Sequence, residues 1–134
     1  MNDRSIAYLD RLFGPGMGER HARFLEHLPP ELSAALHRYH RLEDDESLVS
    51  VEENYLLGMC VLCAQQRWAP AAMFAKTLAH LGTSDARILA AVSRLEMWVG
   101  GIAAAEAAGR MQRAVHAYRR EGLASMASWF PEAS

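Results

Sequence analysis

The amino-acid sequence predicts an all-α fold, a compact bundle of about seven helices in one domain that spans residues 1–134. Three observations predict it. Apolar residues recur at helical spacing, Gly and Pro residues divide the chain into pieces of helical length, and β-branched residues nowhere alternate with polar ones over a strand. A chain of this length buries roughly two-thirds of its unfolded surface, so it needs no metal or disulfide to fold.

Glycine and proline residues set the bounds of the first three predicted helices. Residues 4–13 form the first, which Gly14-Pro15-Gly16 stops. Residues 18–28 form the second, and two prolines end it. Pro30 suits the first position of a third helix over residues 30–42, and the acidic run 43–46 is expected to be a charged loop.

Capping residues predict where the later helices begin and end. Ser50 and Glu53 form a capping box that opens a fourth helix, which runs to about residue 67. A fifth covers residues 70–82 and closes at Gly82, which suits the left-handed position after a helix. The sixth, over residues 85–99, has a predicted buried face of Ile88, Ala91, Val92, Leu95 and Trp98. A seventh, Ala-rich helix covers residues 102–121.

Composition excludes several classes of function. Basic and acidic residues nearly balance, 14 against 16, and no Lys/Arg-rich block interleaves with aromatic residues, so we expect no nucleic-acid partner. Apolar stretches end well before the roughly 20 residues that span a bilayer, so we expect no membrane partner. The N-terminal segment is amphipathic and lacks the apolar core of a secretory signal. We therefore expect a cytoplasmic protein with reduced thiols.

The most informative feature is the pair Cys60 and Cys63, the only cysteines of the chain. Two thiols cannot build a zinc site of four sulfurs, and a disulfide framework would need more bridges. Two interpretations remain open: a redox pair, or two small residues that fill the core.

Helical geometry supports the redox interpretation. At 100° per residue, Glu53, Cys60 and Arg67 line one stripe, and Cys63 lies about 60° from Cys60. Arg67 would stabilise a thiolate, and Glu53 would accept or relay a proton. Against this, thiolates are favoured at helix N-termini, whereas both cysteines lie near the middle of their predicted helix.

Three segments together resemble a known family. Residues 48–59, residues 75–88 with the helix start Gly82-Thr83-Ser84, and residues 98–101 followed by an Ala-rich helix are similar to the carboxymuconolactone decarboxylase and alkylhydroperoxidase D superfamily. The resemblance implies an all-helical fold and rings of three or six subunits. In the peroxidase branch it implies a Glu, a CxxC pair and a His four residues after the second Cys.

The sequence departs from that pattern. Arg67, not His, follows Cys63 by four residues, and the position of the family His falls near Phe74. The family's own CxxC would lie near Arg67 and Pro70, about two turns beyond the pair found here. The resemblance therefore bears on the fold more than on the activity.

Three functions of different kinds follow. The first is a peroxiredoxin-like thiol oxidoreductase, an antioxidant peroxidase that uses Cys60, Cys63, Glu53 and Arg67 as catalytic residues, needs no cofactor or metal, and takes electrons from a protein thiol. The second is a cofactor-free lyase or isomerase in which Arg67 or His80 holds a small carboxylate substrate. The third is a non-catalytic assembly protein that keeps only the oligomeric scaffold.

Other polar residues are weaker candidates. His37, His40 and Glu43 are spaced at three residues and could share a helix face as metal ligands, although such spacing arises easily. His80 is interpreted first as a partner of the helix dipole. His21, His27 and His116 have charged neighbours in the sequence and are expected to be solvated.

The C-terminal part of the chain predicts self-association. The seventh helix carries small residues that permit close helix approach, and the tail beyond Gly122 carries Trp129 and Phe130. We expect a homo-oligomer, a trimer or a hexamer, with this helix or the tail at an interface.

Overall fold

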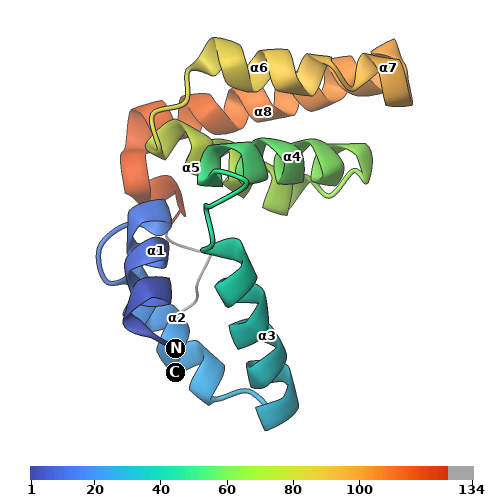
Figure 1. Ribbon diagram of the computed structural model, residues 1–134. Coiled ribbons are helices and arrows are strands. Elements are labelled where there is room, and N and C mark those ends of the chain that lie inside the picture. The colour runs from blue at the N-terminus through green and yellow to red at the C-terminus, as the bar shows by residue number, and fades with distance from the viewer. Residues whose placement is uncertain (127–134) are drawn as a thin grey trace. The chain divides into compact units, whose positions relative to one another are not determined.

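The computed structural model describes residues 1–126, and this part of the chain contains helices and no strand (Figure 1). The all-α prediction is confirmed for these residues, whereas Trp129 and Phe130 lie outside them. The chain divides into two compact units: unit 1, residues 1–51, and unit 2, residues 52–126. The single domain over residues 1–134 stays a prediction. No helix among the described residues is both long and apolar enough to cross a bilayer.

Unit 1 is built from three helices: α1 (Asp3–Phe13), α2 (Met17–Glu26) and α3 (Pro30–Glu43). The side chain of Asn2 caps α1 by accepting a hydrogen bond from the amide of Ser5, at 2.9 Å. Pro30 is the first residue of α3, as its fixed φ predicts. Leu9, Leu12 and Leu25 are fully buried and form the apolar core of the unit.

Gly18 lets α1 and α2 approach each other closely. A Cβ atom at this position would collide with the backbone of Ile6, including its carbonyl oxygen. The α2 amide of Gly18 also donates to the Asp10 carboxylate, at 2.7 Å. The absence of a side chain at residue 18 therefore sets the spacing of the first two helices.

Unit 2 contains α4 (Val51–Ala64), α5 (Trp68–His80), α6 (Asp85–Ser93), α7 (Glu96–Val99), α8 (Gly101–Glu121) and the 3-10 helix η1 (Gly122–Met126). The long helix α8 runs beside α5, α6 and α7 (Figure 1). Helix α4 contacts α5 through the rings of Tyr55 and Phe74, whose centroids are 4.6 Å apart.

The predicted sixth helix is in fact two helices. It breaks after Ser93, whose hydroxyl donates to the Leu89 carbonyl at 2.8 Å, and α7 starts again at Glu96. Ile88, Val92 and Leu95 are buried as expected, but Trp98 is 80% exposed. The prediction for Trp98 was wrong because the break changes the helical register before residue 98.

The small-residue face of α8 packs inside unit 2. Its buried residues are Ala104, Ala107, Met111, Ala114 and Val115. Small side chains permit close helix approach here, as predicted, but the neighbours are α5 and α6 of the same chain. This face is therefore part of the core of the unit.

Candidate functional site

The two cysteines lie on α4, one turn apart, and both thiols are free. Cys63 is buried, at 3% exposure, whereas Cys60 is half-buried. The Cys60 thiol donates to the carbonyl oxygen of Ala91 on α6, at 3.6 Å. Cys60 is thus the thiol that a reagent would reach first, and Cys63 belongs to the buried face of the helix.

The surroundings of both thiols favour the protonated form. Burial raises the pKa of Cys60. Burial, with a smaller contribution from Cys60, raises the pKa of Cys63 to about 11. Because the thiolate is the nucleophile, little of either cysteine is reactive at neutral pH.

The predicted acid Glu53 is exposed on α4, and its neighbour Glu52 is half-buried and contacts Thr83 and Arg87. The Thr83 hydroxyl donates to Glu52 at 2.7 Å, and the Arg87 guanidinium lies 3.0 Å from the other carboxylate oxygen. Glu53 and Cys60 are seven residues apart, a rise of about 10 Å along the helix. The structure therefore places Glu53 two turns from the thiol.

Arg67 does not continue the stripe of Glu53 and Cys60. Helix α4 ends at Ala64, and Gln66 adopts a left-handed φ of 57°. Arg67 is the residue immediately before α5, and its side chain is exposed. The seven-residue spacing assumed an unbroken helix, so the expectation that Arg67 shares a helix face with Cys60 was wrong.

His80 forms a polar contact elsewhere in unit 2. Its Nδ1 atom lies 2.8 Å from the hydroxyl of Tyr118, which links the C-terminal turn of α5 to α8. Tyr118 is 38 residues away from His80 in the sequence, so residue spacing does not predict this contact.

Unit 1 contains a buried polar cluster that sequence reasoning missed. The Nε2 atoms of His21 and His40 are 2.7 Å apart, the Nδ1 atom of His40 lies 3.5 Å from the Glu43 carboxylate, and the Tyr8 hydroxyl donates to the same carboxylate at 3.1 Å. His21 was expected to be solvated, and this was wrong: it is 7% exposed. Charged neighbours in sequence do not report which face of α2 meets α3.

Burial is the main reason that His21 stays neutral. It lowers the pKa of His21 to about 4, and the nearby His40 lowers it further, while Glu43 acts in the opposite direction. A contact between two ring nitrogens needs one donor and one acceptor, and an uncharged His21 can take either role. The contact between His21 and His40 therefore joins α2 to α3 through an uncharged His21 and is sensitive to pH.

His37, His40 and Glu43, the weaker candidates for metal ligands, do not come together as one group. Within residues 1–126, no group of three or more His, Cys, Asp or Glu side chains could hold a metal ion. His40 and Glu43 do meet, but His37 lines a separate pocket, on the α1 side of α3.

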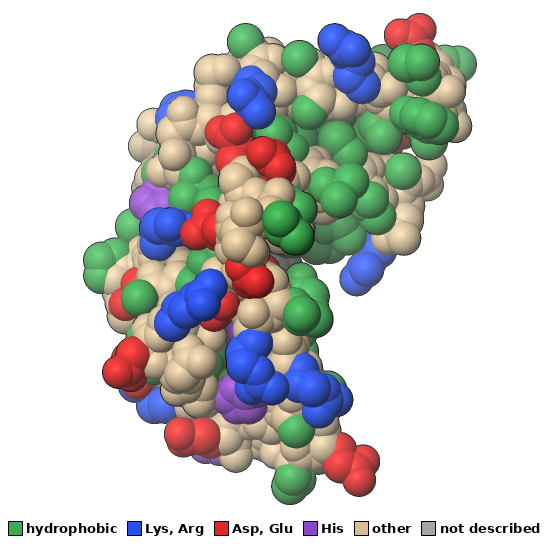
Figure 2. All heavy atoms as spheres, viewed as in Figure 1, with side chains coloured by type: hydrophobic (Ala, Val, Ile, Leu, Met, Phe, Trp, Pro, Cys, Tyr) green, Lys and Arg blue, Asp and Glu red, His purple; other side chains and the backbone are tan. Residues whose placement is uncertain are grey.

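Unit 2 presents an exposed apolar face, here called the α4–α7 face. Its members come from α4, α7 and the start of α8: Leu57, Val61, Met97, Trp98 and Ile102. Figure 2 shows hydrophobic side chains gathered over α4 and toward α7. Ile102 is 91% exposed, and Trp98 nearly as much. Large apolar patches of this kind mark interaction surfaces.

No family model, curated protein or solved structure matches this chain.

Proposed function

We propose that this protein is a non-catalytic, self-associating helical module, and that the α4–α7 face is buried between copies of the chain. The observation that carries the proposal is the exposure of Met97, Trp98 and Ile102 on adjoining turns of unit 2. Burying apolar surface contributes roughly 25 cal/mol per Å². The high pKa of both thiols supports a scaffold in preference to a thiol enzyme.

A second copy is the partner that fits this face best. Most soluble oligomers are symmetric homo-oligomers, and a two-fold interface needs only one self-complementary patch. Aromatic residues and Met are enriched at interface centres, and charged residues are depleted there. Trp98 and Met97 are of that kind. The resemblance to a ring-forming superfamily points the same way.

Light scattering tests the proposal. The wild-type protein should have a mass in solution that is two or more whole multiples of the protomer mass. Ile102→Asp should lower it by a whole-number factor, because the charge would be buried in the interface. Folding should survive, since residue 102 is in the first turn of α8, where an acidic residue is favourable.

Leu48→Asp is the matched control. Leu48 is 93% exposed but precedes α4 and does not belong to the α4–α7 face, so this variant should keep the wild-type mass. A monomeric wild-type protein, or equal masses for Ile102→Asp and wild type, would overturn the proposal.

The second candidate is a thiol oxidoreductase, favoured by one observation: Cys60 is partly accessible, and Cys63 lies free one turn away. The Cys60 thiolate would attack the O–O bond of a hydroperoxide, giving an alcohol and a sulfenic acid. The Cys63 thiolate would then displace hydroxide, which leaves as water, and a disulfide would form. Helical Cβ atoms at this spacing are about 5–6 Å apart and a disulfide needs about 3.8 Å, so α4 would have to distort.

Thiol counting after treatment of the reduced protein with cumene hydroperoxide tests this candidate. Loss of two thiols per wild-type chain would support it, as would formation of one sulfenic acid and no intramolecular disulfide in Cys63→Ser. If both thiols remain titratable after peroxide under native conditions, the redox candidate fails and the cysteines are core residues.

A further inference from the structure

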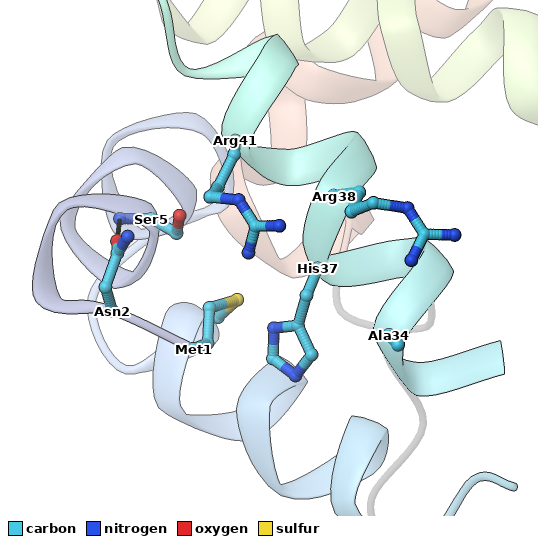
Figure 3. A pocket seen from close by; sticks show the side chains of 7 residues that line it. All are labelled: Met1, Asn2, Ser5, Ala34, His37, Arg38 and Arg41. Carbon is cyan, nitrogen blue, oxygen red and sulfur yellow. Dashed lines mark hydrogen bonds between the residues drawn. The ribbon is translucent and has the colours of Figure 1, made fainter. Parts of the chain in front are cut away.

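A pocket in unit 1 lies between the start of α1 and one face of α3 (Figure 3). Its volume is about 450 Å³, within the range of small-molecule sites. Figure 3 shows the Arg41 guanidinium and the His37 ring facing Met1 and Asn2, with Arg38 at the rim. Arg41 follows His37 by four residues and so lies on the same face of α3, whereas Arg38, adjacent to His37 in the sequence, lies about 100° around the helix.

The charged and titratable side chains that line this pocket are all basic: His37, Arg38 and Arg41. Neither Arg38 nor Arg41 forms an ion pair with another described residue, whereas Arg4 and Arg11 nearby are paired with Asp44 and Glu46. The Arg41 guanidinium therefore faces the pocket with its hydrogen-bond donors available, while the Arg38 guanidinium at the rim points away from Met1 and Asn2 (Figure 3).

Two further features make the pocket favourable for an anion. The N-terminal end of α1, where backbone amides and the helix dipole favour negative charge, lies beside it. Asn2 accepts the Ser5 amide through its oxygen, which leaves its amide nitrogen to donate. Burial lowers the pKa of His37, and the N-terminal amine, His40 and Arg41 lower it further, as expected in a positive potential.

We propose that this pocket binds the phosphate group of a small organic phosphate, held by Arg41 and His37 with Arg38 at the rim. The Arg41 guanidinium matches phosphate in a bidentate geometry, and the His37 ring beside it supplies a further hydrogen-bond donor. The pocket has room for a small organic group beyond the phosphate, against Ala34 and Met1. The proposal is independent of self-association by unit 2.

Calorimetric titration of the full chain with glycerol phosphate, inorganic phosphate and succinate tests this assignment. Glycerol phosphate should bind, and the His37 ring signals should move in NMR spectra. The double variant Arg38→Gln/Arg41→Gln should weaken binding at least tenfold. Arg41→Lys should weaken it less, because the charge remains and the bidentate geometry is lost.

The charge-matched control is Arg23→Gln/Arg67→Gln, which removes two exposed guanidinium groups that do not line the pocket. It should bind glycerol phosphate as the wild type does. If both double variants weaken glycerol phosphate binding equally, the effect comes from net charge alone and the proposed site is wrong. Binding of succinate alone, or no binding of either phosphate, would also overturn the proposal.

Discussion

Units 1 and 2 bury different kinds of side chain. Unit 1 buries charge and polarity: the Asp44 carboxylate accepts from the Ser5 hydroxyl at 2.8 Å and lies 3.3 Å from the Arg4 guanidinium, and the His21–His40 pair joins α2 to α3. Unit 2 buries Met, Ala and Leu side chains along α5 and α8, with Cys63 among its buried residues.

The difference shows where each unit is sensitive. A buried polar contact specifies one arrangement of its helices and depends on pH, whereas an apolar core depends on volume. Unit 1 should therefore respond to protonation as well as to changes of side-chain size, whereas unit 2 should respond mainly to side-chain size and polarity. The three predictions below test this contrast, from the largest expected effect to the smallest.

The largest effect is expected from alanine at the two crowded glycines. Gly18→Ala in unit 1 should reduce the free energy of unfolding by about 3 kcal/mol, because the new methyl meets the Ile6 backbone. Gly58→Ala in unit 2 meets the ring of Phe74, which can rotate, and gains helix propensity, so about 1 kcal/mol is expected. Urea denaturation measures both losses of stability. A larger loss in Gly58→Ala than in Gly18→Ala would contradict the view that the Ile6 backbone is rigid and the Phe74 ring can move.

The second prediction concerns pH. The pKa of His21 is about 4 in the folded protein and near 6.5 when unfolded, so the unfolded chain binds the proton first as pH falls. The stability that neutral His21 provides is complete above about pH 6.5 and is lost toward pH 4. Between pH 7 and pH 5 the loss should be about 2 kcal/mol.

His21→Gln should flatten this pH dependence, since Gln can hydrogen-bond His40 without titrating. His27→Gln is the control because His27 is exposed on the same unit, and it should keep the wild-type slope. An unchanged slope in His21→Gln would show that another group is responsible.

The smallest effect is expected at the thiols. Cys63→Ser puts a hydroxyl into a buried apolar position and should cost about 1–2 kcal/mol, whereas Cys60→Ser, at a half-buried site, should cost less than about 0.5 kcal/mol. Iodoacetamide should modify Cys60 before Cys63. Both rates should rise with pH because the thiolate is the reacting form, and the raised pKa of each thiol should keep them low at neutral pH. Faster modification of Cys63 would contradict its burial.

Local signals predicted most of the secondary structure. The helix starts at Pro30 and Asp85 and the stop at Gly14 were correct because capping residues and fixed φ values act within a few residues. The break after Ser93 was missed, since apolar spacing continues through it at Leu95.

The candidate site shows where sequence reasoning stops. The sequence by itself determined that Cys60 and Cys63 share one helix turn, because helical periodicity is local. Only the tertiary structure decided that their pKa values rise, that Arg67 leaves the helix face, that His21 meets His40 across 19 residues, and that Arg38 and Arg41 line a pocket with the start of α1. Burial, dielectric environment and partners depend on which helix faces pack together, and that arrangement follows from contacts between residues far apart in the chain.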